Sequence, residues 1–341
     1  MACQFEIYFS AAQYPAGTEW ASAALDLVEQ LEEQLSVYRP QSQLSEINRS
    51  AGRRAVPVEP WLFGLLRQAQ TISAQTHGAF DMTTGPLSRA WGFCARSGPD
   101  PVDHDGADQA SAVRPAPRDR TRPGRRVPGA AQLSSALARV GSERLQLDEQ
   151  TDSIRFLTPG MEINVHGIGK GYALDRCAAL LRSAGMQDFL MHGGQSSVVA
   201  AGSHPALPGR GWAVGIRHPL CPDRRLAELL LRDRALGTSG SGTQFFRHRG
   251  AEYGHLIDPR TGYPAKGVYS VTVLARTAAE ADALATALYV LGPEGARQHC
   301  ATHPHRAMLM VGPGPQEGAV TLHQHGLTAN DWRQLADPTA E

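Results

Sequence analysis

The apolar positions of the chain predict helices and strands that follow one another without a regular repeat. Leu25, Val28, Leu31 and Leu35 recur at helical spacing, which predicts a helix over 19–36. Further helices are expected at 42–48, 61–76, 133–140, 172–184 and 280–288. Strands are expected at 1–9, 145–148, 153–157, 161–165, 211–219 and 307–311, with two more joined by a turn at 189–202. This irregular mixture favours an α+β fold with a partly antiparallel sheet, in one compact domain over 1–335 with a polar tail at 336–341.

One stretch, 97–131, interrupts the pattern. It is rich in Pro, Asp and Gly, and its arginines include 114, 118, 120, 122, 125 and 126. Such a run buries too little apolar surface to order itself, so it is interpreted as a mobile surface loop. The alternative is a lid whose arginines contact an acidic partner or a pyrophosphate.

The overall composition excludes several classes of partner. The 33 basic and 33 acidic residues cancel, so no global field attracts nucleic acid or anionic lipid. The five cysteines have no paired spacing, which argues against a zinc knuckle or a disulfide framework. The first residues carry no basic leader and no stretch is long enough to span a bilayer, so we expect a cytoplasmic protein for the chain as given.

Chemistry-bearing side chains gather in a turn-rich loop at 254–264 and in the helix that follows it. In that helix Asp282 and Thr286 are four residues apart, so their oxygens share one face. A carboxylate with a hydroxyl suits Mg²⁺ better than Zn²⁺, which prefers Cys or His. Taken alone, the loop could be ordinary turn chemistry and the helix pair a solvated stripe.

A glycine-rich segment forms the second candidate site. Gly167, Gly169 and Gly171 alternate through it, and Lys170 is one of only two lysines in the chain. The amides and dipole of the helix start favour a phosphate there, and Lys170 adds a full positive charge. The spacing is neither that of a Rossmann loop nor that of a Walker loop, and such a turn also serves plain strand-to-helix packing.

Together these segments resemble the signatures of the ApbE-type flavin transferases, the FAD:protein FMN transferases. The loop and helix are similar to that family's His-x-Ile-Asp-Pro-x-Thr-Gly and Ala-Asp-Ala-x-Ala-Thr elements. The glycine-rich segment is similar to Ile-Asp-Leu-Gly-Gly-Ile-Ala-Lys-Gly-Tyr-Ala-x-Asp. Further matches lie at 36–48, 78–81, 91–93 and 238–240, where the last is expected to be a glycine turn. Many relatives are exported lipoproteins, whereas no export signal is seen in this chain.

Three positions depart from the family pattern. Asn164 stands where the family has an acidic residue, and Gln195 replaces Asp after a Gly-Gly pair. Asn164 can still hydrogen-bond a flavin or ribose, although one negative charge is lost. His166 replaces a small residue and is either a ligand or acid/base group or a packing residue.

The resemblance implies a Mg²⁺-dependent enzyme that moves FMN from FAD to a Thr or Ser hydroxyl of an acceptor protein and releases AMP. The acceptor would carry an Asp-x-x-(Ser/Thr)-Gly-Ala-(Ser/Thr) type motif. Asp282, Thr286 and the Gly167 carbonyl would hold the metal, with Asp282 also catalytic, and Lys170 would bind the cofactor. His255 is the candidate general base, because an imidazole can accept a proton near neutral pH. The flavin and adenine pockets would be lined by Met1, Tyr38, Ala79, Phe80, Asp81, Asn164 and Leu256.

Two other functions remain open from the sequence. The first is an FAD pyrophosphatase that transfers the FMN to water. The second is a non-catalytic flavin-binding protein, which the departures at Asn164 and Gln195 allow.

Overall fold

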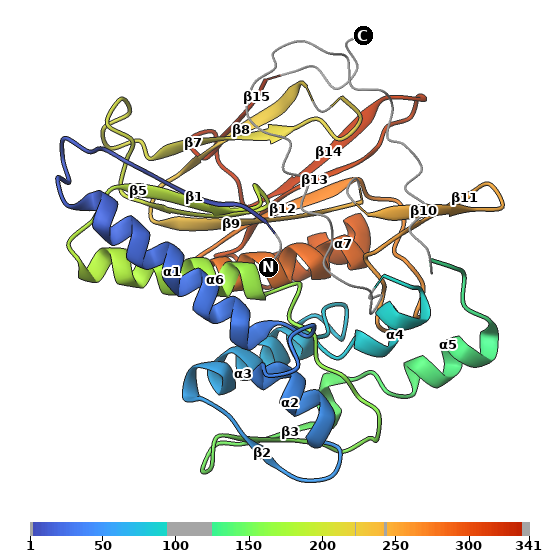
Figure 1. Cartoon of the computed structure of the whole chain (residues 1–341). Helices are drawn as coiled ribbons and strands as arrows, with labels where there is room; N and C mark the ends of the chain where they lie inside the picture. Colours follow the sequence, from blue (N-terminus) through green and yellow to red (C-terminus); the bar gives the residue numbers. More distant parts are fainter. Residues whose placement is uncertain (1–2, 94–124, 222, 242–243, 336–341) are drawn as a thin grey trace.

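The computed structural model describes residues 3–93, 125–221, 223–241 and 244–335 (Figure 1). Most of the Arg/Pro-rich stretch, the tail at 336–341 and Met1 therefore lie outside the described residues. Two predictions therefore concern residues outside the described ranges: the interpretation of 97–124 as a loop or a lid, and the flavin contact of Met1. The described cysteines Cys3, Cys177, Cys221 and Cys300 are all unpaired, as expected.

A seven-stranded antiparallel sheet forms the centre of the fold, which confirms the α+β prediction. Its strand order is β1-β5-β6-β9-β12-β13-β14, and each neighbouring pair is antiparallel. The strands span Phe5–Phe9, Phe189–Gly193, Ser197–Ala201, Arg234–Gly240, Ser270–Ala275, Ala307–Pro313 and Val320–His325, in that same order.

Different layers cover the two faces of this sheet (Figure 1). On one face lie the helices α1 (Gly17–Leu35), α6 (Gly169–Ser183) and α7 (Ala278–Ala301). On the other lies a small sheet of β7, β8 and β15, which span Trp212–Arg217, Arg225–Leu231 and Trp332–Gln334. Side chains alternate accordingly: Val273 of β12 packs toward the helices, and its neighbour Leu274 toward the small sheet.

A second group of elements packs beside the helical layer (Figure 1). It contains α2, α3, α4 and α5, which span Gln43–Ser50, Pro60–Gln75, Gly85–Ala90 and Ala130–Leu137. It also contains η1 and the sheet β2-β4-β3, at Ser142–Arg144, Val56–Pro57, Ser153–Phe156 and Leu145–Asp148. The hairpin of β10 (Phe245–His248) and β11 (Ala251–Gly254) projects from the body next to α4. Among the described helices, none is long and apolar enough to cross a membrane.

The starts of α6 and α7 are in direct contact. A Cβ built on Gly171 would lie 2.1 Å from the carbonyl oxygen of Ala278, so only glycine fits between the two helices. The carboxylate of Asp175 in α6 accepts hydrogen bonds from the amides of Ala278 and Ala279, at 2.7 and 2.9 Å. The Asp175 side chain of α6 therefore caps the start of α7 by accepting hydrogen bonds from its free amides.

Replacing Gly171 with alanine should consequently be costly. The added methyl meets a backbone carbonyl that cannot rotate away, so we expect a loss of about 3 kcal/mol in the free energy of unfolding. Gly64→Ala is the matched control, because Gly64 is also helical and its Cβ would meet nothing within 4 Å. Urea unfolding of both variants checks this, and equal midpoints would contradict the close packing.

Three local predictions were wrong. Residues 238–240 belong to β9 and form no glycine turn; Gly237 is needed because a Cβ there would lie 2.5 Å from the Ala281 carbonyl carbon of α7. Residues 161–165 form no strand, only an isolated bridge between Glu162 and Thr84, and both backbone groups of Ile163 bond the Asn48 side chain. Helix α6 begins at Gly169, three residues before the expected start, because its contact with α7 outweighs glycine's low helix propensity.

Candidate functional site

Asp282 lies at the junction of three elements. It is one turn into α7, and only 6% of its surface is exposed. Its Oδ2 accepts a hydrogen bond from the amide of Gly171 in α6 at 2.8 Å, and its Oδ1 accepts one from Ser197 Oγ of β6 at 2.7 Å. Burial raises the pKa of Asp282, and the positive charge of Lys170 opposes that rise. The carboxylate is thus held rigidly, with lone pairs left over on both oxygens.

The other two expected metal ligands lie beside it. Thr286 Oγ1 is 3.1 Å from Ser239 Oγ and donates to the backbone oxygen of Asp282 at 3.3 Å. A Cβ built on Gly167 would lie 3.3 Å from Thr286 Oγ1, so Gly167 faces this hydroxyl. The structure therefore has Thr286 one turn after Asp282 in α7, with Gly167 opposite the Thr286 hydroxyl.

The chemistry of these donors fits a hard cation. Within the described ranges, no three His, Cys, Asp or Glu side chains gather closely enough to hold an ion. A cation at Asp282 would depend on one carboxylate and on neutral oxygens. Mg²⁺ is commonly held in this way, completing its shell with water and substrate phosphates.

Lys170 is the electrostatic centre of the site. It lies half-buried in the first turn of α6. Its charge lowers the pKa of Asp282, His166 and His255, in each case as a smaller effect than burial. The amide of the next residue is already donated to Asp282, so it is not free for a phosphate as the sequence suggested. An anion at this helix start would rely chiefly on the Lys170 ammonium.

His255 follows β11 and is anchored through one of its ring nitrogens. Its Nδ1 is 3.1 Å from the carbonyl oxygen of Gln244, which also accepts the His255 amide at 3.0 Å. A carbonyl can only accept, so Nδ1 carries the proton and Nε2 has the free lone pair. Burial lowers the pKa of His255, the bond to Gln244 opposes this, and the charges of Arg125 and Lys170 lower it further. The lowered pKa favours the neutral ring, the form that can accept a proton.

His166 and Tyr38 face each other as nearly parallel rings. Their centroids are 6.3 Å apart with an interplanar angle of 17°. The His166 side chain is open to solvent, yet the protein atoms around it lower its pKa to about 4, and the charges of Lys170 and His255 add to this. Asn164 Oδ1 accepts a hydrogen bond from the His166 amide at 2.9 Å. The amide side chain at the family's acidic position thus caps the turn that carries His166.

Ala79, Phe80 and Asp81 are buried beneath this region. The Asp81 carboxylate is used within the protein: Oδ1 accepts from the amide and hydroxyl of Thr83, and Oδ2 accepts from the Ser142 amide. The Phe80 ring lies against Gly167, where a Cβ would be 3.2 Å from its Cε2. Their contact with a cofactor stays a prediction, as does that of the half-buried Leu256.

Two partners of the site residues were missed from the sequence: Ser197, which donates to Asp282, and Gln244, whose carbonyl holds His255. Ser239 and Arg125 were noted only as parts of the 238–240 match and of the Arg/Pro-rich stretch, and they contact Thr286 and the Phe245 carbonyl. No spacing signal marks these pairings, because the packing of separate strands and loops sets them. Gln195, which was singled out, instead accepts a hydrogen bond from Arg217 at 2.8 Å.

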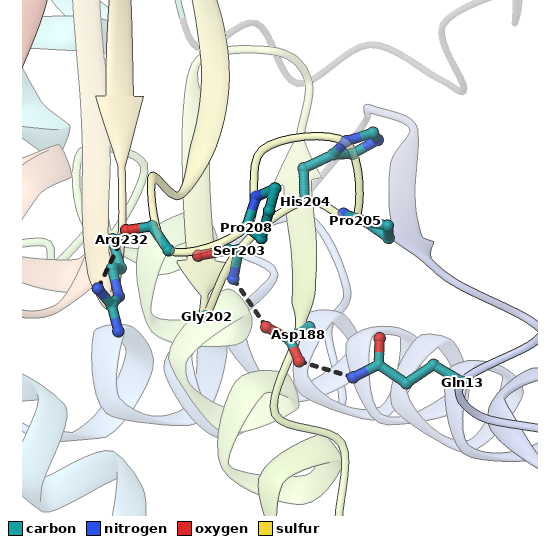
Figure 2. Close-up of a pocket in the computed structure, with 9 residues that line it drawn as sticks. Gln13, Asp188, Gly202, Ser203, His204, Pro205, Pro208 and Arg232 are labelled. Atoms are coloured by element: carbon teal, nitrogen blue, oxygen red, sulfur yellow. Dashed lines mark hydrogen bonds between the residues drawn. The ribbon is translucent and has the colours of Figure 1, made fainter.

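A surface pocket of about 320 Å³ lies at the opposite end of β5 and β6 (Figure 2). Asp188 accepts hydrogen bonds there from Gln13 and from the Ser203 amide, at 2.7 and 2.8 Å. Ser197 and Asp282 do not line it. The pocket therefore belongs to the loops beyond β6 and not to the site around Lys170.

Known proteins similar to this chain belong to one family. The sequence model of the ApbE family matches residues 1–310. An FAD:protein FMN transferase of Klebsiella pneumoniae is 32% identical over 271 residues, covering 77% of this chain and 69% of that protein. One from Vibrio cholerae is 30% identical over 270 residues, covering 79% and 72%.

Solved structures show the same fold. The flavin transferase ApbE of Vibrio cholerae superimposes with a TM-score of 0.76 and 25% identity, covering 95% of this chain and 94% of the other. The ApbE protein of Thermotoga maritima superimposes with a TM-score of 0.75 and 26% identity, covering 94% and 96%.

Proposed function

Because the chain belongs to the ApbE family, we propose that it transfers FMN from FAD to a Thr or Ser hydroxyl of an acceptor flavoprotein and releases AMP. The acceptor segment would carry the Asp-x-x-(Ser/Thr)-Gly-Ala-(Ser/Thr) type motif. The observation that supports this best is the buried Asp282 carboxylate, held by α6 and β6 and next to Thr286 and Gly167. Lys170, whose positive charge acts on Asp282, supports the proposal as a cation that could bind a pyrophosphate.

The proposed reaction replaces the phosphoanhydride bond of FAD by a phosphoester bond to the acceptor. The acceptor oxygen forms a bond to the phosphorus of the FMN half, and the bond from that phosphorus to the bridging oxygen breaks, so AMP leaves with that oxygen. The hydroxyl proton passes to Nε2 of His255, the ring nitrogen that is not bonded to Gln244. Phosphoryl transfer of this kind needs mainly positioning and charge neutralisation.

Three side chains would hold the substrate for this step. Lys170 would bind the pyrophosphate, and Tyr38 would contact the flavin, with Asn164 as a hydrogen-bonding partner. The chemistry that Mg²⁺ supplies, when held by Asp282, Thr286 and the Gly167 carbonyl, is neutralisation of the negative charge on the pyrophosphate. Positioning of the substrate otherwise depends on side chains and backbone groups of the protein itself.

Intact mass of an acceptor peptide tests the proposal. The full chain is incubated with FAD, Mg²⁺ and a peptide bearing the acceptor motif, and the added mass of FMN is expected on the peptide. Rapid AMP and free FMN without the peptide would indicate an FAD pyrophosphatase instead. Stoichiometric FAD retention without AMP in any divalent metal would indicate a flavin-binding protein.

The Arg/Pro-rich stretch gives a separate prediction. Deleting 97–124 and bridging the gap with a short Gly/Ser linker should leave FAD affinity unchanged, because these residues lie outside every matched motif. The sequence suggested extending the deletion to 131, but Arg125 and Val127 pack beside α4, and α5 begins at Ala130. Fluorescence titration of FAD measures the effect, with the deletion to 131 for comparison. A large loss of affinity for the shorter deletion would indicate a lid.

A further inference from the structure

Arg125 connects the end of the Arg/Pro-rich stretch to the wall of the site. Its Nη1 donates a hydrogen bond to the carbonyl oxygen of Phe245 at 2.7 Å. Its Cζ lies 5.4 Å from the centre of the Phe93 ring, within range of a cation–π contact. The guanidinium is therefore held between the chain after α4 and the start of β10.

Both groups that Arg125 contacts are neighbours of His255. Phe245 directly follows Gln244, whose carbonyl oxygen holds the His255 amide and Nδ1. The Phe93 ring meets the His255 ring edge-on, with centroids 6.5 Å apart and an angle of 70°. A change at Arg125 would thus reach His255 by two separate routes, through the backbone and through an aromatic ring.

We propose that Arg125 is a positioning residue that acts through Phe245 and Phe93 to hold the His255 ring with Nδ1 on Gln244 and Nε2 free. This inference rests on the proposed function, in which His255 accepts the proton. Arg125 lies outside the motifs that carry the family resemblance, so the resemblance alone gives it no role.

The charges around His255 give the inference a measurable consequence. Arg125 and Lys170 both lower the pKa of His255, after the larger effect of burial, and the His166 ring is the other titratable group that interacts with it. A nearby cation disfavours the protonated imidazole. Removing the Arg125 charge should therefore raise the pKa of His255, so that the transfer rate begins to fall at a higher pH on acidification.

Two substitutions separate the charge from the hydrogen-bond geometry. Arg125→Gln removes the charge but leaves an amide that can donate to the Phe245 carbonyl. Arg125→Lys keeps the charge but loses the planar group that both donates and stacks on Phe93. Arg126→Gln is the matched control. Arg126 is the next residue and is exposed, and the substitution removes the same positive charge.

Histidine NMR on the full chain, labelled with ¹⁵N, gives a readout that does not depend on transfer. We expect Arg125→Gln to raise the pKa of His255, while Arg125→Lys leaves it near the parental value but increases the fraction of the other tautomer. Arg126→Gln should change neither. For transfer, both Arg125 variants should be roughly tenfold slower at neutral pH, with the KM for FAD unchanged, since a hydrogen bond from a charged group is lost.

The possible outcomes distinguish the two proposals. If the His255 titration and tautomer are the same in the parent and in both Arg125 variants, the role of Arg125 is wrong. If the parent titrates as expected but transfers no FMN to any acceptor peptide, the proposed function is wrong, and the NMR comparison still decides what Arg125 does. A rise in the KM for FAD with an unchanged titration would make Arg125 a substrate contact and overturn the positioning role.

Discussion

Asp282→Ala is expected to abolish FMN transfer while leaving part of the FAD affinity in place. The carboxylate is the only charged ligand among the three proposed for Mg²⁺. Its loss therefore removes the strongest hold on the cation that would neutralise the charge developing on the phosphates during transfer. It also leaves the Gly171 amide and the Ser197 hydroxyl without their acceptor, which should cost about 1–3 kcal/mol of stability. Asp282→Asn is the matched control, because it keeps the shape and one acceptor but loses the charge.

The neighbouring hydroxyl should behave differently. We expect added Mg²⁺ to rescue Thr286→Ala far better than Asp282→Ala, because a neutral hydroxyl binds a hard cation more weakly than a carboxylate does. Transfer rate against Mg²⁺ concentration, scored by in-gel flavin fluorescence, measures both variants. Parental activity of Asp282→Ala at every metal concentration would eliminate the proposed site.

His255→Asn should lower the transfer rate by roughly a hundredfold or more, the usual scale for loss of a general base. Asparagine can still donate to the Gln244 carbonyl, so the loop should keep its place. FAD affinity is therefore expected to change little, as measured by fluorescence titration.

The pH dependence provides a second check on this residue. Burial lowers the pKa of His255 below 6.5, and only the neutral ring can accept a proton. The parental transfer rate should therefore fall as the pH drops through that lowered pKa. The pH–rate profile of His255→Asn should not show this fall. If His255→Asn transfers FMN at the parental rate, either His166 is the base or the reaction needs no general base.

Local patterns in the sequence were enough to predict much of the helical structure. Asp282 and Thr286 are one turn apart in α7, as their spacing predicts, and the Thr286 hydroxyl donates to the Asp282 backbone oxygen. The helix expected at 42–48 begins with a serine of the kind that caps helices, and the Ser42 side chain accepts the Ser45 amide. These features depend only on near neighbours in the chain, so periodicity and residue type determine them.

The roles of glycine were decided by contacts between elements. The sequence shows where a side chain is missing but not whether the backbone turns there or another element approaches. Gly237 and Gly171 both turned out to make room for α7. Because that contact also stabilises the first turn of α6, the helix begins earlier than propensity predicts.

The polar partners of the site were likewise set by tertiary structure alone. Asp282 is bonded by groups that lie 85 and 111 residues away in the sequence. Asp175 accepts the amides at the start of a different helix, and Asp81 accepts the amide of Ser142, 61 residues away. Such pairs form only when the sheet and helices have packed, since no local pattern records which distant donor will meet a given acceptor. The local sequence therefore indicates which residues are candidates for the chemistry, whereas the packing of α6, α7 and β6 sets how these side chains are held.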